Sequence, residues 1–426
     1  MEIERQAIEI LKKGYICDNC LGRSWGQLLS GMTNEERGKT IRYYLAFVFD
    51  SGEKLDVDLS NFYGIKFRNV KIEAKKPGKC KVCKNFLTEK LDILAKSIAK
   101  KLEGIQFDTF LVGSIPSDEI LNEEEKIQET GIEFIEPIKS EINRELGKRI
   151  EKLIGKRFDL KNPDITIIVD LDADTVRTQV KSLYVYGKYQ KLARGIPQTK
   201  WICSKCDGKG CTFCKGEGKL YKTSIQEIIE TPILKATNSK NSSFHGSGRE
   251  DIDARNLDWR PFVIELIKPV RRKINLKEIG KRINKSKKVK AKALRIVDNG
   301  KELVRKLKTD RIDKTYFVDV EFKNKIDRKL LKNLKNITKE AILQKTPTRV
   351  VHRRANKTRK RHVKRFSYKL VGNKRMQFRI RAESGLYIKE LVSGDEGRTQ
   401  PNIGELLNNK VRSIKLDVIK IYLGKS

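Results

Sequence analysis

Residues 244–257 read FHGSGREDIDARNL, and this stretch decides how the second half of the chain is interpreted. It holds two glycines, two arginines and two aspartates among few apolar residues, and it directly precedes a strand-like run at 261–268. Polar loops held at the edge of a rigid sheet commonly carry catalytic groups. A helix N-cap with a local Arg/Asp ion pair would fit the same letters, so the stretch by itself leaves both interpretations open.

The segments on either side of this stretch alternate between strand and helix patterns. Apolar residues recur at every second position in 262–266, 316–322, 366–370 and 376–380, and helical periodicity appears in 276–284 and 327–334. The pattern predicts an α+β domain over 221–426 with a mainly antiparallel or mixed sheet.

A basic run interrupts these strands at 353–365, RRANKTRKRHVKR, with no apolar periodicity. Runs of like charge are usually solvated loops. Because these charges repel one another when no polyanion is present, we favour a loop that follows nucleic-acid phosphates.

The net charge supports a polyanionic partner. The chain of 426 residues carries 93 Lys+Arg against 55 Asp+Glu, +38 in all, and divides into +7 for residues 1–250 and +31 for 251–426. With 38% hydrophobic residues it is too apolar for a disordered polycation. No apolar run approaches the roughly 18 residues of a membrane span, and the first residues do not resemble a signal peptide. We expect a cytoplasmic protein without a membrane segment.

All eight cysteines fall into CxxC pairs, which in a reducing compartment are typical of zinc ligands. Their order suggests two four-thiolate structural sites, with no open position for a catalytic water. The expected ligands are Cys17, Cys20, Cys80 and Cys83 in one site, and Cys203, Cys206, Cys211 and Cys214 in the other. Unmetallated redox pairs remain the alternative, so one or two structural zinc ions are expected.

The second set also resembles the zinc repeats of DnaJ-type chaperones over 16 residues. The His-Pro-Asp signature of a J domain is absent from the sequence. A chaperone-like or non-catalytic zinc RNA-binding module therefore remains an alternative function.

The first half suggests two further modules. Residues 1–83 form a predicted zinc module, and 84–200 contain a helix near 142–154, strands at 164–170 and 175–180, and the stretch YVYGKYQKLAR at 184–194. This order resembles the THUMP RNA-binding domain, with tyrosines and basic residues suited to stacking on single-stranded RNA. We interpret the acidic segment 117–138 as a solvated insert, and 201–220 as a knuckle that links to the catalytic domain.

Three motifs in order resemble one enzyme family. HGSGREDIDAR (245–255) contains a GR-x-D motif like that of pseudouridine synthases; QKTPTRVVHRR (344–354) and AESGLYIKELVSGDEGRTQPNI (382–403) resemble the Pus-ten family of archaeal and eukaryotic tRNA pseudouridine synthases. The resemblance covers essentially the whole chain. It implies tRNA as partner, uridines 54 and 55 of the T loop as targets, and no catalytic metal or nucleotide cofactor.

The resemblance also implies roles for individual residues. Asp251 matches the catalytic aspartate, which acts at a flipped nucleotide either by adding to the base or by assisting a glycal route. Asp253 lies outside the GR-x-D position, and we expect it to have a supporting role. Arg249 is expected to hold a neighbouring phosphate or the space left by the extruded base.

The remaining pocket residues follow from the same family. Tyr387, Ile388 and Lys389 match a Tyr-Ile-Arg/Lys element of TruB-like enzymes, in which the basic residue pairs with the catalytic aspartate and the aliphatic residue walls the pocket. Tyr316 fits the base-stacking tyrosine, although it could also be ordinary core, and Leu416 fits a late wall residue. Lys389 is therefore the expected partner that keeps Asp251 ionised.

Other THUMP-containing tRNA-modifying enzymes are a further alternative. A methyltransferase would need a glycine-rich loop for S-adenosylmethionine, and a thiouridine synthase would need an SGGxDS loop. Neither pattern occurs in the sequence.

Overall fold

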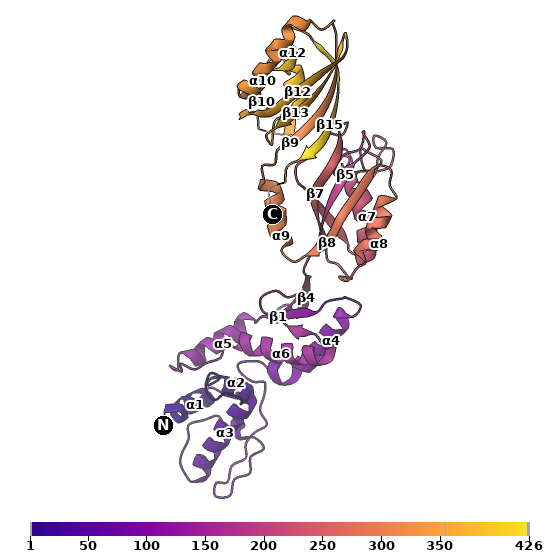
Figure 1. The fold of residues 1–426 in the computed structure, drawn as a ribbon. Helices are drawn as coiled ribbons and strands as arrows, with labels where there is room; N and C mark the ends of the chain where they lie inside the picture. Colours follow the sequence, from indigo (N-terminus) through magenta and orange to yellow (C-terminus); the bar gives the residue numbers. More distant parts are fainter. Residues whose placement is uncertain (1, 354, 424–426) are drawn as a thin grey trace. The chain divides into compact units, whose positions relative to one another are not determined.

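The chain forms two compact units, residues 1–181 and 182–426, in a computed structural model that describes residues 2–353 and 355–423. Figure 1 colours the first unit from indigo to magenta and the second from magenta to yellow. Among the described residues, no helix combines the length and the apolar character needed to cross a bilayer.

The first unit packs helices around a four-stranded sheet of order β2-β1-β3-β4, parallel except for the antiparallel pair β3/β4. Its elements are α1 (Glu2–Lys12), α2 (Asp18–Arg23), α3 (Asn34–Asp50), η1 (Leu59–Phe62), η2 (Phe86–Lys90), α4 (Leu91–Leu102), β1 (Thr109–Ile115), α5 (Asp118–Gln128), α6 (Ile138–Ile154), β2 (Arg157–Phe158), β3 (Ile165–Asp170) and β4 (Thr175–Val180).

One continuous core holds this unit together. Its buried residues run from Ala7 in α1 through the first four cysteines to Val169 in β3. On α6, the apolar residues spaced three or four apart, such as Ile142 and Leu146, face this core. The sequence suggested separate modules at 1–83 and 84–200; in the structure residues 1–181 share one core.

The acidic segment differs from its expected role as a solvated insert. Part of it forms α5, which Ser117 caps by accepting a hydrogen bond from the amide of Ile120. Glu124 in this helix is buried and accepts a hydrogen bond of 2.5 Å from Arg23, which is also buried. A buried carboxylate that is paired with a buried cation does not need to be hydrated. The count of charged residues in the sequence did not reveal this pairing.

The second unit contains the other helices and two sheets. Its elements are β5 (Leu183–Lys191), α7 (Ile225–Thr237), β6 (Asn241–Gly246), β7 (Arg255–Ile267), α8 (Leu276–Asn284), β8 (Val289–Val297), α9 (Gly300–Thr309), β9 (Lys314–Phe322), η3 (Arg328–Lys335), α10 (Asn336–Lys339), β10 (Ile342–Lys345), η4 (Thr348–Arg353), β11 (Thr358–Arg361), β12 (Val363–Gly372), β13 (Arg375–Ala382), α11 (Ile388–Ser393), β14 (Thr399–Gln400), α12 (Ile403–Leu406) and β15 (Val411–Ile421).

The large sheet of this unit has eight strands in the order β12-β13-β9-β15-β7-β5-β8, with β6 paired to β7. Its pairs are antiparallel except for a short parallel contact of β15 with β7. The fold is thus α+β with a mixed sheet, as the sequence predicted. Strand β5 differs from its assignment to the THUMP-like region, because it lies between β7 and β8 in this sheet.

Helices cover this sheet in two places. Helices α7 and α8 bury their apolar faces against β5 and β7, while α10, α11 and α12 lie on the β9–β13 part (Figure 1). A smaller antiparallel sheet, β11-β10-β14, adjoins them. The basic run is therefore not wholly loop: Thr358–Arg361 pairs with β10, and Arg354 lies outside the described residues.

Candidate active site and cysteine clusters

The loop carrying Asp251 connects β6 to β7, two paired strands of the large sheet. Gly248 in this loop has φ +74°, and a Cβ there would lie 3.3 Å from Nη1 of the buried Arg260. A side chain would therefore be both strained and crowded at this position. The backbone conformation and the close approach of Arg260 therefore both favour glycine at this position of the GR-x-D motif.

A buried polar network lies beneath the loop. The hydroxyl of Tyr189 is 3.0 Å from both carboxylate oxygens of Glu250, and Nε of Arg260 is 3.1 Å from one of them. Gln198 donates to the Tyr189 hydroxyl at 2.8 Å and to the carbonyl of Gly248 at 2.9 Å. Burial and the charge of Glu250 raise the pKa of Tyr189 well above its usual value. Glu250, the variable position of the motif, thus anchors the loop.

Two further side chains hold the loop backbone. The ammonium group of the buried Lys191 donates to the carbonyls of Asp251 at 2.9 Å and Ile252 at 2.8 Å. Burial lowers the pKa of Lys191 to about 8. Arg194 donates to the carbonyls of Asp253 and Leu416, both at 2.8 Å, so the loop is fixed to β5 and β15 together.

Two cations from other elements contact the Asp251 carboxylate. Nη1 of Arg349 lies 2.9 Å from Oδ1, and Nζ of Lys389 lies 3.5 Å from Oδ2. Lys389 is closer to Asp253, with both carboxylate oxygens at 2.7 Å. Burial works to raise the pKa of Asp253, but the bond and charge of Lys389 outweigh it and lower that pKa. The sequence expectation paired Lys389 with Asp251, and the two do form an ion pair; Arg349, which was not expected there, lies closer to Asp251.

Arg349 also binds a second carboxylate. Its Nε lies 2.6 Å from Oε1 of Glu390, a residue only 4% exposed in α11. Burial works against the charge of Arg349, but the bonds and charges of Glu390 and Asp251 outweigh it and raise the pKa of Arg349. Its guanidinium carbon is 5.8 Å from the ring centroid of Tyr387.

The residues expected to wall the pocket differ in how deeply they are buried. Ile388 and Leu416 are buried in the core that also contains Val318 of β9. Tyr316 lies on β9 opposite Val418 and Ile380, and burial raises its pKa to about 12, with the charge of Asp251 as a smaller contribution. Tyr316 is thus a half-buried residue of a strand that lies between β13 and β15.

The other two expected residues contribute in different ways. Tyr387 joins the site through its backbone, because its amide donates to Oε1 of Gln344 at 2.8 Å. Arg249 is exposed, and its guanidinium carbon is 5.2 Å from the ring centroid of Trp201.

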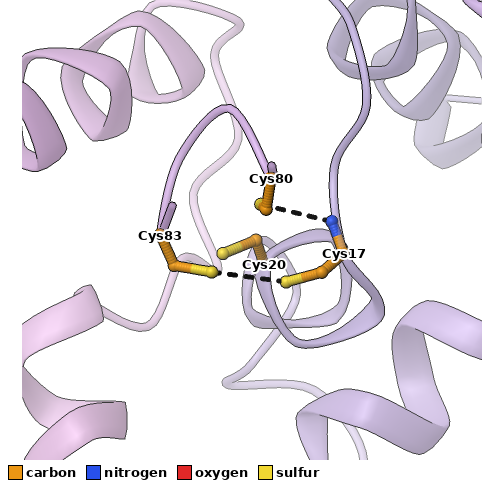
Figure 2. A group of neighbouring side chains, drawn as sticks. All are labelled: Cys17, Cys20, Cys80 and Cys83. Carbon is orange, nitrogen blue, oxygen red and sulfur yellow. Dashed lines mark hydrogen bonds between the residues drawn. The ribbon is translucent and has the colours of Figure 1, made fainter. Parts of the chain in front are cut away.

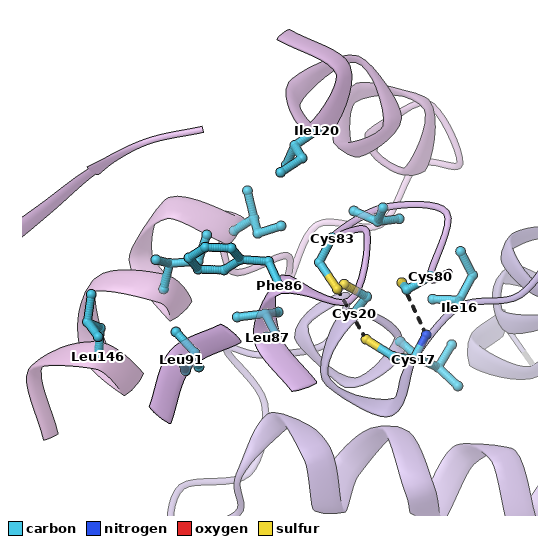
Figure 3. Close-up of a cluster of buried hydrophobic side chains, with 14 of the residues drawn as sticks. Ile16, Cys17, Cys20, Cys80, Cys83, Phe86, Leu87, Leu91, Ile120 and Leu146 are labelled. Atoms are coloured by element: carbon cyan, nitrogen blue, oxygen red, sulfur yellow. Dashed lines mark hydrogen bonds between the residues drawn. The ribbon is translucent and has the colours of Figure 1, made fainter. Parts of the chain in front are cut away.

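The first four cysteines form a buried cluster. Cys17 and Cys20 come from the start of α2, and Cys80 and Cys83 from a turn before η2 (Figure 2). Their sulfur atoms all lie within 4.8 Å of one another. Apolar side chains, including Phe86 and Leu87, surround them (Figure 3). Four free thiols converging in an apolar core fit a tetrahedral metal ion, which would join the two chain segments.

The second cluster is compact and less buried. Its four sulfur atoms, from Cys203, Cys206, Cys211 and Cys214, also lie within 4.8 Å of one another. Backbone amides of Gly210, Cys211 and Gly218 donate to cluster sulfurs at 3.2 Å. Such bonds stabilise thiolates, so this cluster too could hold a metal ion. It belongs to the second unit, with Trp201 connecting it to Arg249 of the β6–β7 loop.

Several residues of this site carried no signal in the sequence. Glu250 and Glu390 look like ordinary charged surface residues, and Lys191 was expected to contact RNA; the importance of all three comes from burial against specific partners. Arg349 lies within a motif that resembled the Pus-ten family, but nothing in its neighbours indicated a contact with Asp251, 98 residues away.

Comparisons with known proteins agree with these observations. The chain matches the family model "Pus10, C-terminal" over residues 184–422 and "Pus10 THUMP domain, archaeal" over residues 94–170. A chain of the Cbf5-Nop10-Gar1 complex is similar over 55% of this chain and 48% of its own, with 14% identity and a TM-score of 0.31, which is too remote to support an argument.

Sequence relatives extend over nearly the full length. "tRNA pseudouridine synthase Pus10" of Methanothrix thermoacetophila is 39% identical and covers 97% of this chain and 93% of its own; that of Methanopyrus kandleri is also 39% identical, covering 97% of each. The protein of the same name from Methanocaldococcus jannaschii is 38% identical, with 97% and 93% covered. These matches confirm the family inferred from the sequence motifs. The chain belongs to the Pus10 family of tRNA pseudouridine synthases, and is an isomerase with a THUMP domain.

Proposed function

We propose that this protein converts uridine to pseudouridine at positions 54 and 55 in the T loop of tRNA, with Asp251 as the catalytic carboxylate. The observation that supports this most is the placement of Asp251 on an anchored loop, its carboxylate between Arg349 and Lys389. Both cations contact this carboxylate directly, and either proposed route uses it as the reacting group. Family membership sets aside the chaperone-like and non-catalytic alternatives.

The reaction is an isomerisation whose atoms balance without a redox partner. The bond from uracil N1 to ribose C1′ breaks, a bond from C5 to C1′ forms, C5 loses a proton and N1 gains one. Asp251 either adds to the base or assists deprotonation on the way to a glycal. Because the target base must leave its stack, the enzyme has to receive a flipped nucleotide.

The other site residues receive roles from their positions. Tyr316, half-buried on β9, stacks on the flipped base, and Ile388 and Leu416 wall the pocket beside it. Lys389 contacts both Asp251 and Asp253, and its bond and charge hold the pKa of Asp253 below its usual value. Tyr387 supports the start of α11, and the exposed Arg249 contacts a phosphate or the gap left by the flipped base.

We also propose that each four-cysteine cluster holds one structural zinc ion. Four thiolates complete a tetrahedral shell and leave no position for a reacting water, so zinc would stabilise the fold only. The free cysteines fit a reducing cytoplasm. The strong positive charge of residues 251–426 fits electrostatic contact with tRNA phosphates, and the THUMP domain would add further RNA contacts.

The decisive experiment maps pseudouridine in a T-loop tRNA transcript incubated with the wild type and with Asp251→Ala. We expect no product at positions 54 and 55 from the variant, with tRNA affinity within a few-fold of the wild type. Asp298→Ala is the matched control, because it removes an exposed aspartate of the same unit. Wild-type product from Asp251→Ala would refute the assignment.

A further inference from the structure

The carboxylate of Asp251 lies in the middle of a row of five charges that alternate in sign. In order they are Glu390, Arg349, Asp251, Lys389 and Asp253, joined by closest contacts of 2.6, 2.9, 3.5 and 2.7 Å. The row comes from three separate parts of the second unit: the β6–β7 loop, the η4 segment and α11.

The two ends of the row differ in burial. Glu390 is 4% exposed, whereas the side chain of Asp253 is 61% exposed. An ion pair against a buried carboxylate is held firmly, because leaving that carboxylate without its cation is costly. The exposed end is screened by solvent and holds its partner loosely. Arg349 is therefore the cation of the row that pairs with a buried carboxylate, and Lys389 the one that pairs with an exposed carboxylate.

The segment that carries Arg349 is itself tied down. The hydroxyl of the fully buried Thr346 donates to the carbonyl of Ala355 at 2.7 Å, and its amide donates to the carbonyl of Lys357 at 3.1 Å. The amide of Thr348 donates to Oδ2 of Asp395 at 3.0 Å. These bonds close a loop whose base lies on the small sheet, so Arg349 is held on a preorganised support.

We propose that Arg349 and Glu390 form a clamp that orients the Asp251 carboxylate toward the flipped uridine, with Arg349 as a positioning residue and Glu390 acting through it. The inference rests on the proposed function of Asp251. Arg349 fixes Oδ1, and the weaker contact at Oδ2 leaves that oxygen the freer of the two to meet the substrate. Correct orientation of a reacting group accounts for a large share of enzymatic rate acceleration.

The clamp makes a specific kinetic prediction. Arg349→Gln keeps a planar polar group but removes the charge, so kcat should fall by about ten-fold or more while the KM for tRNA stays within about three-fold. Arg349→Lys restores the charge without the two-sided fork and should recover part of kcat. Glu390→Gln should lower kcat several-fold.

A double variant separates the clamp from independent effects. Because Glu390 acts through Arg349, the Arg349→Gln/Glu390→Gln variant should lose no more kcat than Arg349→Gln alone. Arg375→Gln is the matched control: Arg375 pairs with Asp319 in the same sheet, away from the row, and its loss should leave kcat unchanged. Thermal unfolding of every variant shows whether it is folded at the assay temperature.

Three outcomes would overturn the clamp. A raised KM with unchanged kcat in Arg349→Gln would make Arg349 a phosphate contact. Additive losses in the double variant would detach Glu390 from Arg349, and an equal kcat loss in Arg375→Gln would show a general charge effect. Failure of the proposed function would look different, because Asp251→Ala would then retain product; the clamp fails alone when Asp251→Ala is inactive and Arg349→Gln keeps its kcat.

Discussion

The hydroxyl of Tyr189 in β5 lies 3.0 Å from both carboxylate oxygens of Glu250, immediately before Asp251 in the chain. This contact joins a strand that the sequence assigned to the RNA-binding region to the loop that carries Asp251. Arg260 is the third member of this buried group, because its Nε pairs with the Glu250 carboxylate. Replacing any one of the three side chains removes a partner from at least one of the others.

We therefore predict a large stability cost for removing Glu250. Glu250→Ala leaves the buried Arg260 without its carboxylate, which should lower the free energy of unfolding by about 3–5 kcal/mol. Tyr189→Phe removes one hydrogen bond to a charged group and should cost about 1.5–3 kcal/mol. Urea unfolding of the second unit measures both. Tyr368→Phe, on an exposed ring of β12, is the control, and similar values for all three variants would contradict the prediction.

A second prediction concerns the pH dependence of the first unit. Burial raises the pKa of Glu141 from 4.5 to about 7, and within the described part of the chain its Oε2 has no hydrogen-bond partner. Between these values the folded state binds more protons than the unfolded state, so stability falls as the pH rises from about 4.5 to about 7. The full effect is on the order of 3 kcal/mol.

Glu141→Gln tests this directly because it mimics the protonated form at every pH. The variant should be more stable than the wild type at pH 8 and should lack the decline between pH 5 and 7. Glu145→Gln, on the solvent side of the same helix and with a lowered pKa, is the control. A wild-type decline that persists in Glu141→Gln would show that another group causes it.

Metal analysis should return two equivalents of zinc per chain, released at different rates. Cys206 and Cys211 are partly exposed, whereas the four cysteines of the first cluster are buried. A chelator should therefore remove one zinc quickly and the other slowly. Cys206→Ser should abolish the fast phase and Cys80→Ser the slow one. A single equivalent in the wild type would eliminate one of the proposed sites.

Binding of tRNA should weaken steeply with salt, because phosphate contacts release counterions. Lys357→Gln and Lys360→Gln remove exposed cations from the basic run, and each should reduce the slope of log K against log salt by about one. Lys39→Gln in α3 removes an exposed lysine of the first unit for comparison. Unchanged slopes for both basic-run variants would place the phosphate contacts elsewhere.

Local patterns in the sequence predicted several elements of this fold. The periodicity at 276–284 and 175–180 matches α8 and β4 residue for residue, because each segment exposes one clear face. The assignment of β5 differed because its tyrosines and lysines suit RNA stacking as well as a sheet, and only the partners β7 and β8 decide between them. Pairing between strands that are far apart in the sequence leaves no signal in the residues of either strand alone.

The candidate site likewise contains some residues that the sequence indicated and others that it did not. The GR-x-D motif indicated Asp251, and the Tyr-Ile-Lys element indicated Lys389, because both are carried by contiguous letters. Arg349 and Glu390 could not be found this way, since their roles depend on distances between side chains from separate elements. Nor could the sequence show that Asp253 would take the closer contact with Lys389.

The uneven burial of the two cysteine clusters has a consequence for oxidative damage. Peroxide attacks accessible thiolates first. The partly exposed cysteines, Cys206 and Cys211, belong to the second cluster, which adjoins the β6–β7 loop through Trp201 and Arg249. Oxidation would then disturb the handling of substrate while the buried cluster still keeps the first unit intact. Under oxidative stress such an enzyme would stop modifying RNA before it unfolds. Reduction of the thiols would then restore its activity without synthesis of new protein.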